Sequence, residues 1–130
     1  MKKLLLVGCA LAALVVPASA RLAFLLDTIN NSRWAIDGEC NAPAKTYVAS
    51  VKVGDGTSVI TWQDGLGNTD VEWVFYSQGN EFRTLTVSSV HNRYDNSPGT
   101  GWIYRAVNDS FDTMRITKFG KPFYVSRCYE

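Results

Sequence analysis

The first residue to consider for catalysis is the single histidine of this chain. His91 lies close to Ser88 and Ser89, and Asp95 follows it. A Ser-His-Asp triad needs three converging side chains, with the histidine oriented by the acid. In an extended strand, Ser89 and His91 would share a face with Cα atoms roughly 6.6 Å apart. No Gly-x-Ser-x-Gly elbow surrounds either serine. We therefore expect a non-catalytic protein, and a small secreted hydrolase that uses His91 is the alternative.

Carboxylates gather around one glycine-rich turn and give a second candidate site. Asp64, Asn68, Asp70 and Glu72 could offer converging oxygens to calcium, but their spacing is not that of an EF-hand loop. Asp70 and Glu72 alternate with Trp73 along a predicted strand, so we expect both carboxylates to point to solvent. The same pair could act as acid and base in a hydrolase, which is the second form of the alternative. We expect no metal site and no cofactor.

Arginines and aromatic residues favour binding over catalysis. One arginine falls on each of the last four predicted strands, namely Arg83, Arg105, Arg115 and Arg127. They could form an anion-binding patch, although cross-strand pairs with Asp and Glu explain them equally well. The chain also has four tryptophans and six tyrosines, residue types that dominate binding hot spots. Our candidate binding residues lie in and beside the long polar loop of residues 92–101, and are Arg93, Tyr94, Trp102 and Arg105.

The N-terminus has the three parts of a secretory signal peptide. Met1–Lys3 is a short basic start, Leu4–Val16 is an apolar run, and Ala18-Ser19-Ala20 matches the small-residue cleavage pattern. The apolar run is shorter than the roughly 20 residues that a membrane span needs. The sequence thus predicts a signal peptide over residues 1–20, cleavage after Ala20, a periplasmic or secreted mature chain, and no transmembrane span.

Removal of the predicted signal peptide changes both the net charge and the number of cysteines. Loss of Lys2 and Lys3 lowers the 13 basic residues to 11, against 12 acidic residues. This balance argues against nucleic acid as a partner, because such binding needs a basic excess. Cys9 is also removed with the signal peptide, so Cys40 and Cys128 remain. Two cysteines in an exported chain are most simply one disulfide.

Residues 21–130 are expected to form a single all-β domain. Residues 21–31 could form a short helix or an extended arm. Eight runs rich in β-branched and aromatic residues follow, over residues 33–36, 45–53, 58–63, 69–76, 81–90, 102–107, 113–119 and 123–129. Short connections imply an antiparallel meander. Cys40 follows the first strand and Cys128 lies in the last, so their pairing favours a closed barrel over a sandwich.

The architecture resembles two groups of known proteins. A short leader, a first strand with Arg33-Trp34-Ala35 and a meander closed by a disulfide are similar to lipocalin-like barrels and to small periplasmic inhibitors of proteases and lysozymes. Ser32-Arg33 precedes Trp34 where lipocalins have Gly-x-Trp, and no functional residue carries over. The resemblance implies a binding module or inhibitor. We expect an exported, non-enzymatic binding protein whose partner is a protein or a small molecule.

These inferences about processing predict the mass of the exported protein. The mature chain should begin at Arg21, and reduction should add about 2 Da, because one disulfide takes up two hydrogens. Intact mass spectrometry of freshly purified periplasmic material measures both values. Free thiols, or a chain that retains residues 1–20, would contradict the prediction.

Overall fold

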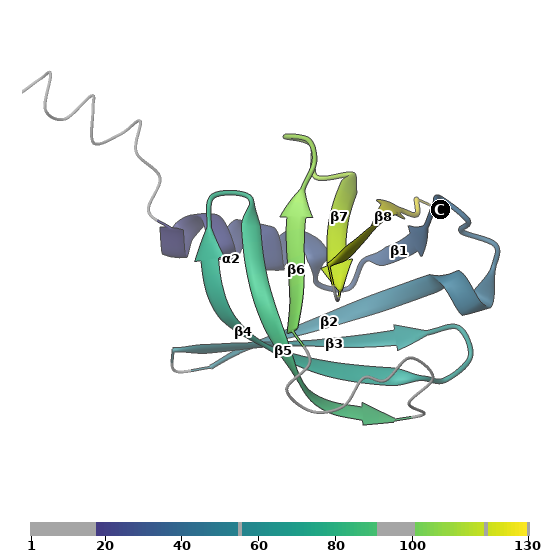
Figure 1. Cartoon of the computed structure of the whole chain (residues 1–130), viewed down its shortest axis with the longest axis horizontal. Coiled ribbons are helices and arrows are strands. Elements are labelled where there is room, and N and C mark those ends of the chain that lie inside the picture. The colour runs from purple at the N-terminus through teal and green to yellow at the C-terminus, as the bar shows by residue number, and fades with distance from the viewer. Residues whose placement is uncertain (1–17, 55, 91–100, 119, 130) are drawn as a thin grey trace, which may run out of the picture.

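The computed structural model describes residues 18–54, 56–90, 101–118 and 120–129, and within them the chain forms one closed antiparallel β-barrel. The elements in chain order are α2 (Ala18–Ile29), β1 (Arg33–Ile36), the 3₁₀ turn η1 (Pro43–Lys45), β2 (Thr46–Gly54), β3 (Thr57–Asp64), β4 (Thr69–Gln78), β5 (Glu81–Val90), β6 (Gly101–Ala106), β7 (Thr113–Lys118) and β8 (Lys121–Arg127). Each strand pairs with its neighbours in sequence, and β8 returns to β1 (Figure 1). The predicted all-β barrel is confirmed.

The barrel closes through its shortest strand. In β1, Trp34 lies opposite Tyr47 of β2 on one side and Arg127 of β8 on the other. Trp34 is fully buried. The strand ends at Ile36, and the turn after it contains Asp37 and Gly38, whose left-handed φ angles are 53° and 74°. Glycine adopts this region without a Cβ clash, so the turn predicted at this point is formed.

The disulfide joins the two ends of the meander. Cys40 and Cys128 are bonded, with Cα atoms 5.9 Å apart. The backbone N–H of Cys128 donates to the carbonyl of Arg33 at 2.8 Å, beside the bridge. The predicted pairing is therefore confirmed, and it holds β8 against β1 where the barrel closes.

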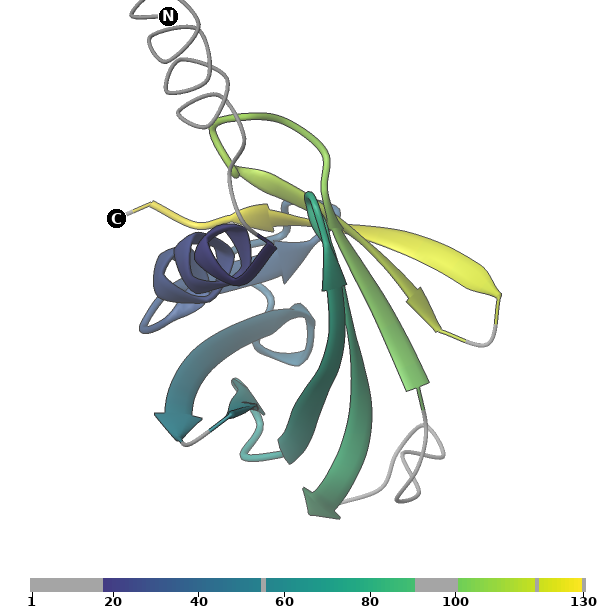
Figure 2. The same ribbon diagram turned by 90° about the vertical axis from the view of Figure 1, so that its left-hand side faces the viewer.

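Helix α2 covers one end of the barrel, where β4 turns into β5 (Figures 1 and 2). Its buried residues Leu25, Leu26 and Ile29 belong to the same core cluster as the barrel interior. Arg21 Nε donates to Asn80 Oδ1 at 2.8 Å and ties the helix to the β4–β5 turn. Of the two forms expected for this segment, the helix is the one observed. Among the described residues, no helix is long and apolar enough to cross a membrane.

Strand β4 has the opposite orientation to the one predicted. Asp70 and Glu72 point into the barrel, where they lie opposite Trp62 and Ile60 of β3. Glu72 is only 1% exposed, whereas Trp73 on the other face is 37% exposed. The expectation that both carboxylates face solvent was wrong. It assumed that the more apolar face is buried, but the register with β3 and β5 fixes which face lies inside.

The position of the disulfide predicts its contribution to stability. Replacing both cysteines, as Cys40→Ser with Cys128→Ser, should lower the free energy of unfolding by about 4–5 kcal/mol, because the bridge closes a long loop in the unfolded chain. Urea titration followed by circular dichroism measures the loss. A change below about 1 kcal/mol would contradict this prediction.

Candidate functional site

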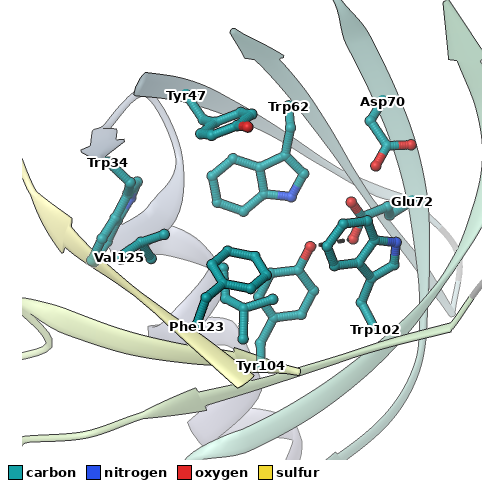
Figure 3. A pocket seen from close by; sticks show the side chains of 10 residues that line it. Trp34, Tyr47, Trp62, Asp70, Glu72, Trp102, Tyr104, Phe123 and Val125 are labelled. Carbon is teal, nitrogen blue, oxygen red and sulfur yellow. Dashed lines mark hydrogen bonds between the residues drawn. The ribbon is translucent and has the colours of Figure 1, made fainter. Parts of the chain in front are cut away.

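A partly enclosed cavity of about 60 Å³ lies inside the barrel (Figure 3). It is lined by residues of seven strands, which are Trp34, Tyr47, Trp62, Asp70, Glu72, Trp102, Tyr104, Ile116, Phe123 and Val125. Many of these residues come from the strand ends opposite α2, such as the start of β4 and the start of β6. The cavity has room for a few water molecules or a ligand of a few non-hydrogen atoms, since one water takes up roughly 30 Å³ in the liquid.

Aromatic rings form most of the cavity wall. Tyr104 is stacked between Phe82, with ring centroids 4.8 Å apart, and Trp62, at 6.0 Å. Trp102 meets Phe123 edge-on at 6.5 Å. Its indole N–H donates to the hydroxyl oxygen of Thr86 at 3.0 Å, which fixes the ring beside the carboxylates. The ring orientations are therefore set by contacts within the protein.

Glu72 is held in place by two hydroxyl groups. Its Oε1 accepts hydrogen bonds from the Thr84 hydroxyl, at 2.7 Å, and from the Tyr104 hydroxyl. Thr84 is fully buried and Tyr104 is 2% exposed. A buried carboxyl group is tolerated only when it is hydrogen-bonded in this way or neutralised. The two donors come from β5 and β6, so three adjacent strands fix the position of this group.

Burial and mutual contact raise the pKa values of both carboxyls. The pKa of Glu72 lies well above its ordinary value because the group is desolvated and because the neighbouring Asp70 carboxyl favours its protonated form. Desolvation also raises the pKa of Asp70, although the contact with Glu72 and the charge of Lys118 oppose the rise. Two carboxyls this close cannot both ionise freely. The pair therefore retains a proton at pH values where exposed carboxyls have lost theirs.

Desolvation also acts on the phenol of Tyr104, whose hydroxyl donates a hydrogen bond to Glu72. Burial, and then the charge of Glu72, raise the pKa of Tyr104 well above its ordinary value, so the hydroxyl remains a hydrogen-bond donor. The nearby indole of Trp62 opposes this rise, but its N–H does not have the geometry of a hydrogen bond.

Within the described part of the chain, two buried polar atoms on the cavity wall have no hydrogen-bond partner. They are Trp62 Nε1, a donor, and Asp70 Oδ1, an acceptor. Trp62 is 7% exposed and its ring edge faces the side of the cavity that holds the carboxyls (Figure 3). A buried polar group without a partner costs about 1–3 kcal/mol. Unsatisfied groups that face one open cavity indicate a place for a ligand or water.

A lysine stands at the rim of this cavity. Lys118 Nζ lies 4.3 Å from the centroid of the Trp102 ring, which is a cation–π contact. The positive charge of Lys118 also lowers the pKa of Asp70, so its electrostatic effect extends into the barrel. Lys118 thus places an ammonium group against the aromatic wall at the rim.

The structure describes two of the four predicted binding residues, Trp102 and Arg105. Trp102 lines the cavity, but Arg105 lies on the outer face, where it is 4.0 Å from Glu81. Arg83 pairs with the same Glu81 at 3.2 Å, so an acidic residue occupies part of the proposed arginine patch. His91, Arg93 and Tyr94 lie outside the described residues.

Sequence reasoning missed Trp62 and Tyr104 as site residues. The signal that could have found them is the set of polar residues on one face of β4 and β5, where Asp70, Glu72, Thr84 and Thr86 share inward positions. A strand that places carboxyls and hydroxyls on its buried face requires partners across the barrel. That face could be recognised only once the strand pairing was known.

The carboxylates expected near the glycine-rich turn separate into two places. Asp64 stays in the turn, where its Oδ1 accepts from the backbone N–H groups of Leu66, at 2.9 Å, and Asn68, at 2.8 Å. Asp70 and Glu72 enter the barrel. In the part of the chain that the structure describes, no three potential metal-binding side chains cluster. Asp64 therefore stabilises the turn.

No protein-family model, curated protein or solved structure matches the chain. The resemblance to lipocalin-like barrels remains one of architecture. The function is therefore argued from the geometry and chemistry of the cavity.

The raised pKa of Glu72 predicts how stability depends on pH. A carboxyl whose pKa is higher in the folded state contributes fully below its unfolded pKa, near 4.5. Stability is then lost as pH rises toward the folded pKa. Glu72→Gln keeps the shape and the acceptor oxygen but cannot ionise. We expect this variant to match the wild type at about pH 4 and to be more stable by at least about 1 kcal/mol at about pH 8.

Thermal unfolding at several pH values tests this prediction. Glu81→Gln is the matched control, because Glu81 lies outside the cavity with Arg83 and Arg105. The control should show no gain in stability at high pH. If Glu72→Gln is equally or less stable than the wild type across the range, Glu72 is not held protonated by burial.

Proposed function

We propose that this protein is an exported, non-enzymatic barrel that binds a small molecule in its interior. The observation that carries the proposal is the pair of partnerless buried atoms, Trp62 Nε1 and Asp70 Oδ1, on the wall of one cavity. Binding sites for small molecules are typically preformed, largely apolar and equipped with a few convergent polar groups. The cavity has each of these properties.

Preorganisation supports the same function. Hydrogen bonds of Thr84 and Tyr104 to Glu72, and of Trp102 to Thr86, orient the wall without any ligand. A site that is already ordered loses little side-chain entropy on binding, which favours affinity for even a small ligand. The cavity volume of about 60 Å³ limits the buried part of that ligand to a few non-hydrogen atoms.

The alternative of a hydrolase rests on the presence of Asp70 and Glu72 in one cavity. The two carboxyls are neighbours on one face of β4, and each shifts the pKa of the other. Glycosidases hold their two carboxyls at least about 5 Å apart, so that the sugar or a water fits between them. A cavity this small also has little space for both sides of a scissile bond. We therefore favour binding over hydrolysis.

Nuclear magnetic resonance of the indole N–H groups tests the proposal. The probes are four compounds of about four or five non-hydrogen atoms that differ in charge and polarity, namely 2-hydroxyethylammonium, n-propylammonium, ethylene glycol and glycolate. At least one probe should shift the signal of Trp62 saturably, because that N–H faces the cavity. Trp73 is the internal control, since it lies on the outer face of the same barrel.

A uniform shift of Trp62 and Trp73 would indicate only a solvent effect. Absence of a saturable shift of Trp62 with all four probes would overturn interior binding. Catalysis is tested separately: turnover of a peptide, ester or glycan that is lost in Asp70→Asn would support the hydrolase instead.

A further inference from the structure

We propose that the ligand of the cavity is a small protonated amine that also carries a hydrogen-bond acceptor, as an amino alcohol does. This inference rests on the proposed function and names the chemical class of its ligand. It follows from the charge of the cavity lining, from its aromatic walls and from the chemical types of the two partnerless atoms.

The charge of the lining selects a cation. Among the described residues, those that line the cavity include Asp70 and Glu72 and no arginine, lysine or histidine. Both carboxyls are removed from bulk water, and interactions between charges are stronger where water is excluded. A cation placed beside the pair offsets its negative charge, whereas an anion would add to it. A neutral ligand would leave any charge on the pair uncompensated.

The walls of the cavity are also suited to a cation. The faces of aromatic rings attract ammonium groups, most strongly when water is excluded. The structure contains one example, because Lys118 Nζ lies over Trp102 at 4.3 Å. A protonated amine deeper in the cavity would meet Trp62 together with the carboxyls, whereas both faces of the Tyr104 ring are covered by Phe82 and Trp62.

The two partnerless atoms are of opposite kinds. Asp70 Oδ1 can only accept a hydrogen bond when ionised, and Trp62 Nε1 can only donate one. A simple alkylamine would satisfy Asp70 but would leave the indole N–H without a partner. A ligand with an ammonium group and a nearby hydroxyl oxygen satisfies both. The number of atoms in such a ligand agrees with the small volume of the cavity.

Binding of this ligand would release a proton from the carboxyl pair. Among the described residues, the titratable groups around the cavity are Asp70 and Glu72 of β4, Tyr47 of β2, Tyr104 of β6 and, at the rim, Lys118 of β7. A bound ammonium favours the ionised form of both carboxyls and therefore competes with their shared proton. Affinity should rise as pH increases from about 5 to about 8, where the amine remains protonated.

The test uses the mature protein and compares the same four probes, which are of about equal size. At about pH 8 we expect 2-hydroxyethylammonium to bind most tightly. Loss of the acceptor in n-propylammonium, or of the charge in ethylene glycol, should weaken binding about tenfold or more. Glycolate should bind worst because it carries a negative charge. The saturable shift of the Trp62 indole signal gives each dissociation constant.

Two charge-changing variants test the sign of the ligand charge. The double variant Asp70→Asn with Glu72→Gln keeps the shape of the cavity and should weaken binding of 2-hydroxyethylammonium about tenfold or more. Lys118→Gln removes a like charge at the rim and should tighten binding about two- to fivefold. The matched controls are Glu81→Gln and Arg115→Gln, which change charge on residues that do not line the cavity. Both controls should bind like the wild type.

The outcomes separate this inference from the proposed function. If no probe shifts the Trp62 indole signal saturably, the proposal of interior binding is refuted. If ethylene glycol or glycolate binds as tightly as 2-hydroxyethylammonium, interior binding stands and the cationic ligand is overturned. Equal binding of n-propylammonium would overturn the requirement for an acceptor. An unchanged affinity in the double variant would also refute the inference, because the carboxyl pair would then not contact the ligand.

Discussion

Pairing of the four-residue strand β1 with both β2 and β8 is the constraint on which the rest of the molecule depends. Closure gives each of the eight strands a paired neighbour on both sides and fixes the register of every strand. The disulfide holds the same seam, with Cys40 just beyond β1 and Cys128 just beyond β8. Once the seam is closed, the alternation of each strand decides which side chains enter the interior. The position of the carboxyl pair is a consequence of that geometry.

The two halves of the interior differ in chemistry. On the α2 side, Leu25 and Ile29 fill the barrel, and Trp34 meets Phe111 edge-on at 5.8 Å. This part is a conventional close-packed core. Toward the opposite end the lining contains carboxyls, hydroxyls and indole N–H groups, and a cavity remains. The apolar core at one end thus stabilises a barrel whose other end contains polar residues with unsatisfied hydrogen-bonding atoms.

Burial of Asp70 and Glu72 opposes folding, since a charge removed from water is unfavourable unless it is paired. The protein lessens this effect with two hydroxyl donors to Glu72 and with a shared proton. It leaves Asp70 Oδ1 and Trp62 Nε1 without partners. A ligand that satisfies them would stabilise the folded state through mass action. The two unsatisfied atoms would therefore both lower the stability of the ligand-free protein and increase its affinity for a ligand that satisfies them.

The sequence by itself determined the class of the fold. Period-two runs of Val, Ile, Thr and aromatic residues, with turns such as Asp37-Gly38, predicted all eight strands, and the two remaining cysteines predicted the bridge. These signals are local, or depend only on composition. The leader over residues 1–20 remains a prediction from the same kind of pattern.

Only the tertiary structure decided which face of β4 is inside. Val71, Trp73 and Phe75 are the more apolar set, and local patterning would bury them. The register with β3 instead turns Asp70 and Glu72 inward, and β5 and β6 supply Thr84 and Tyr104 as donors to Glu72. Those donors are 12 and 32 residues away from Glu72. A strand pattern contains no information about such distant partners, because they come together only when the barrel closes.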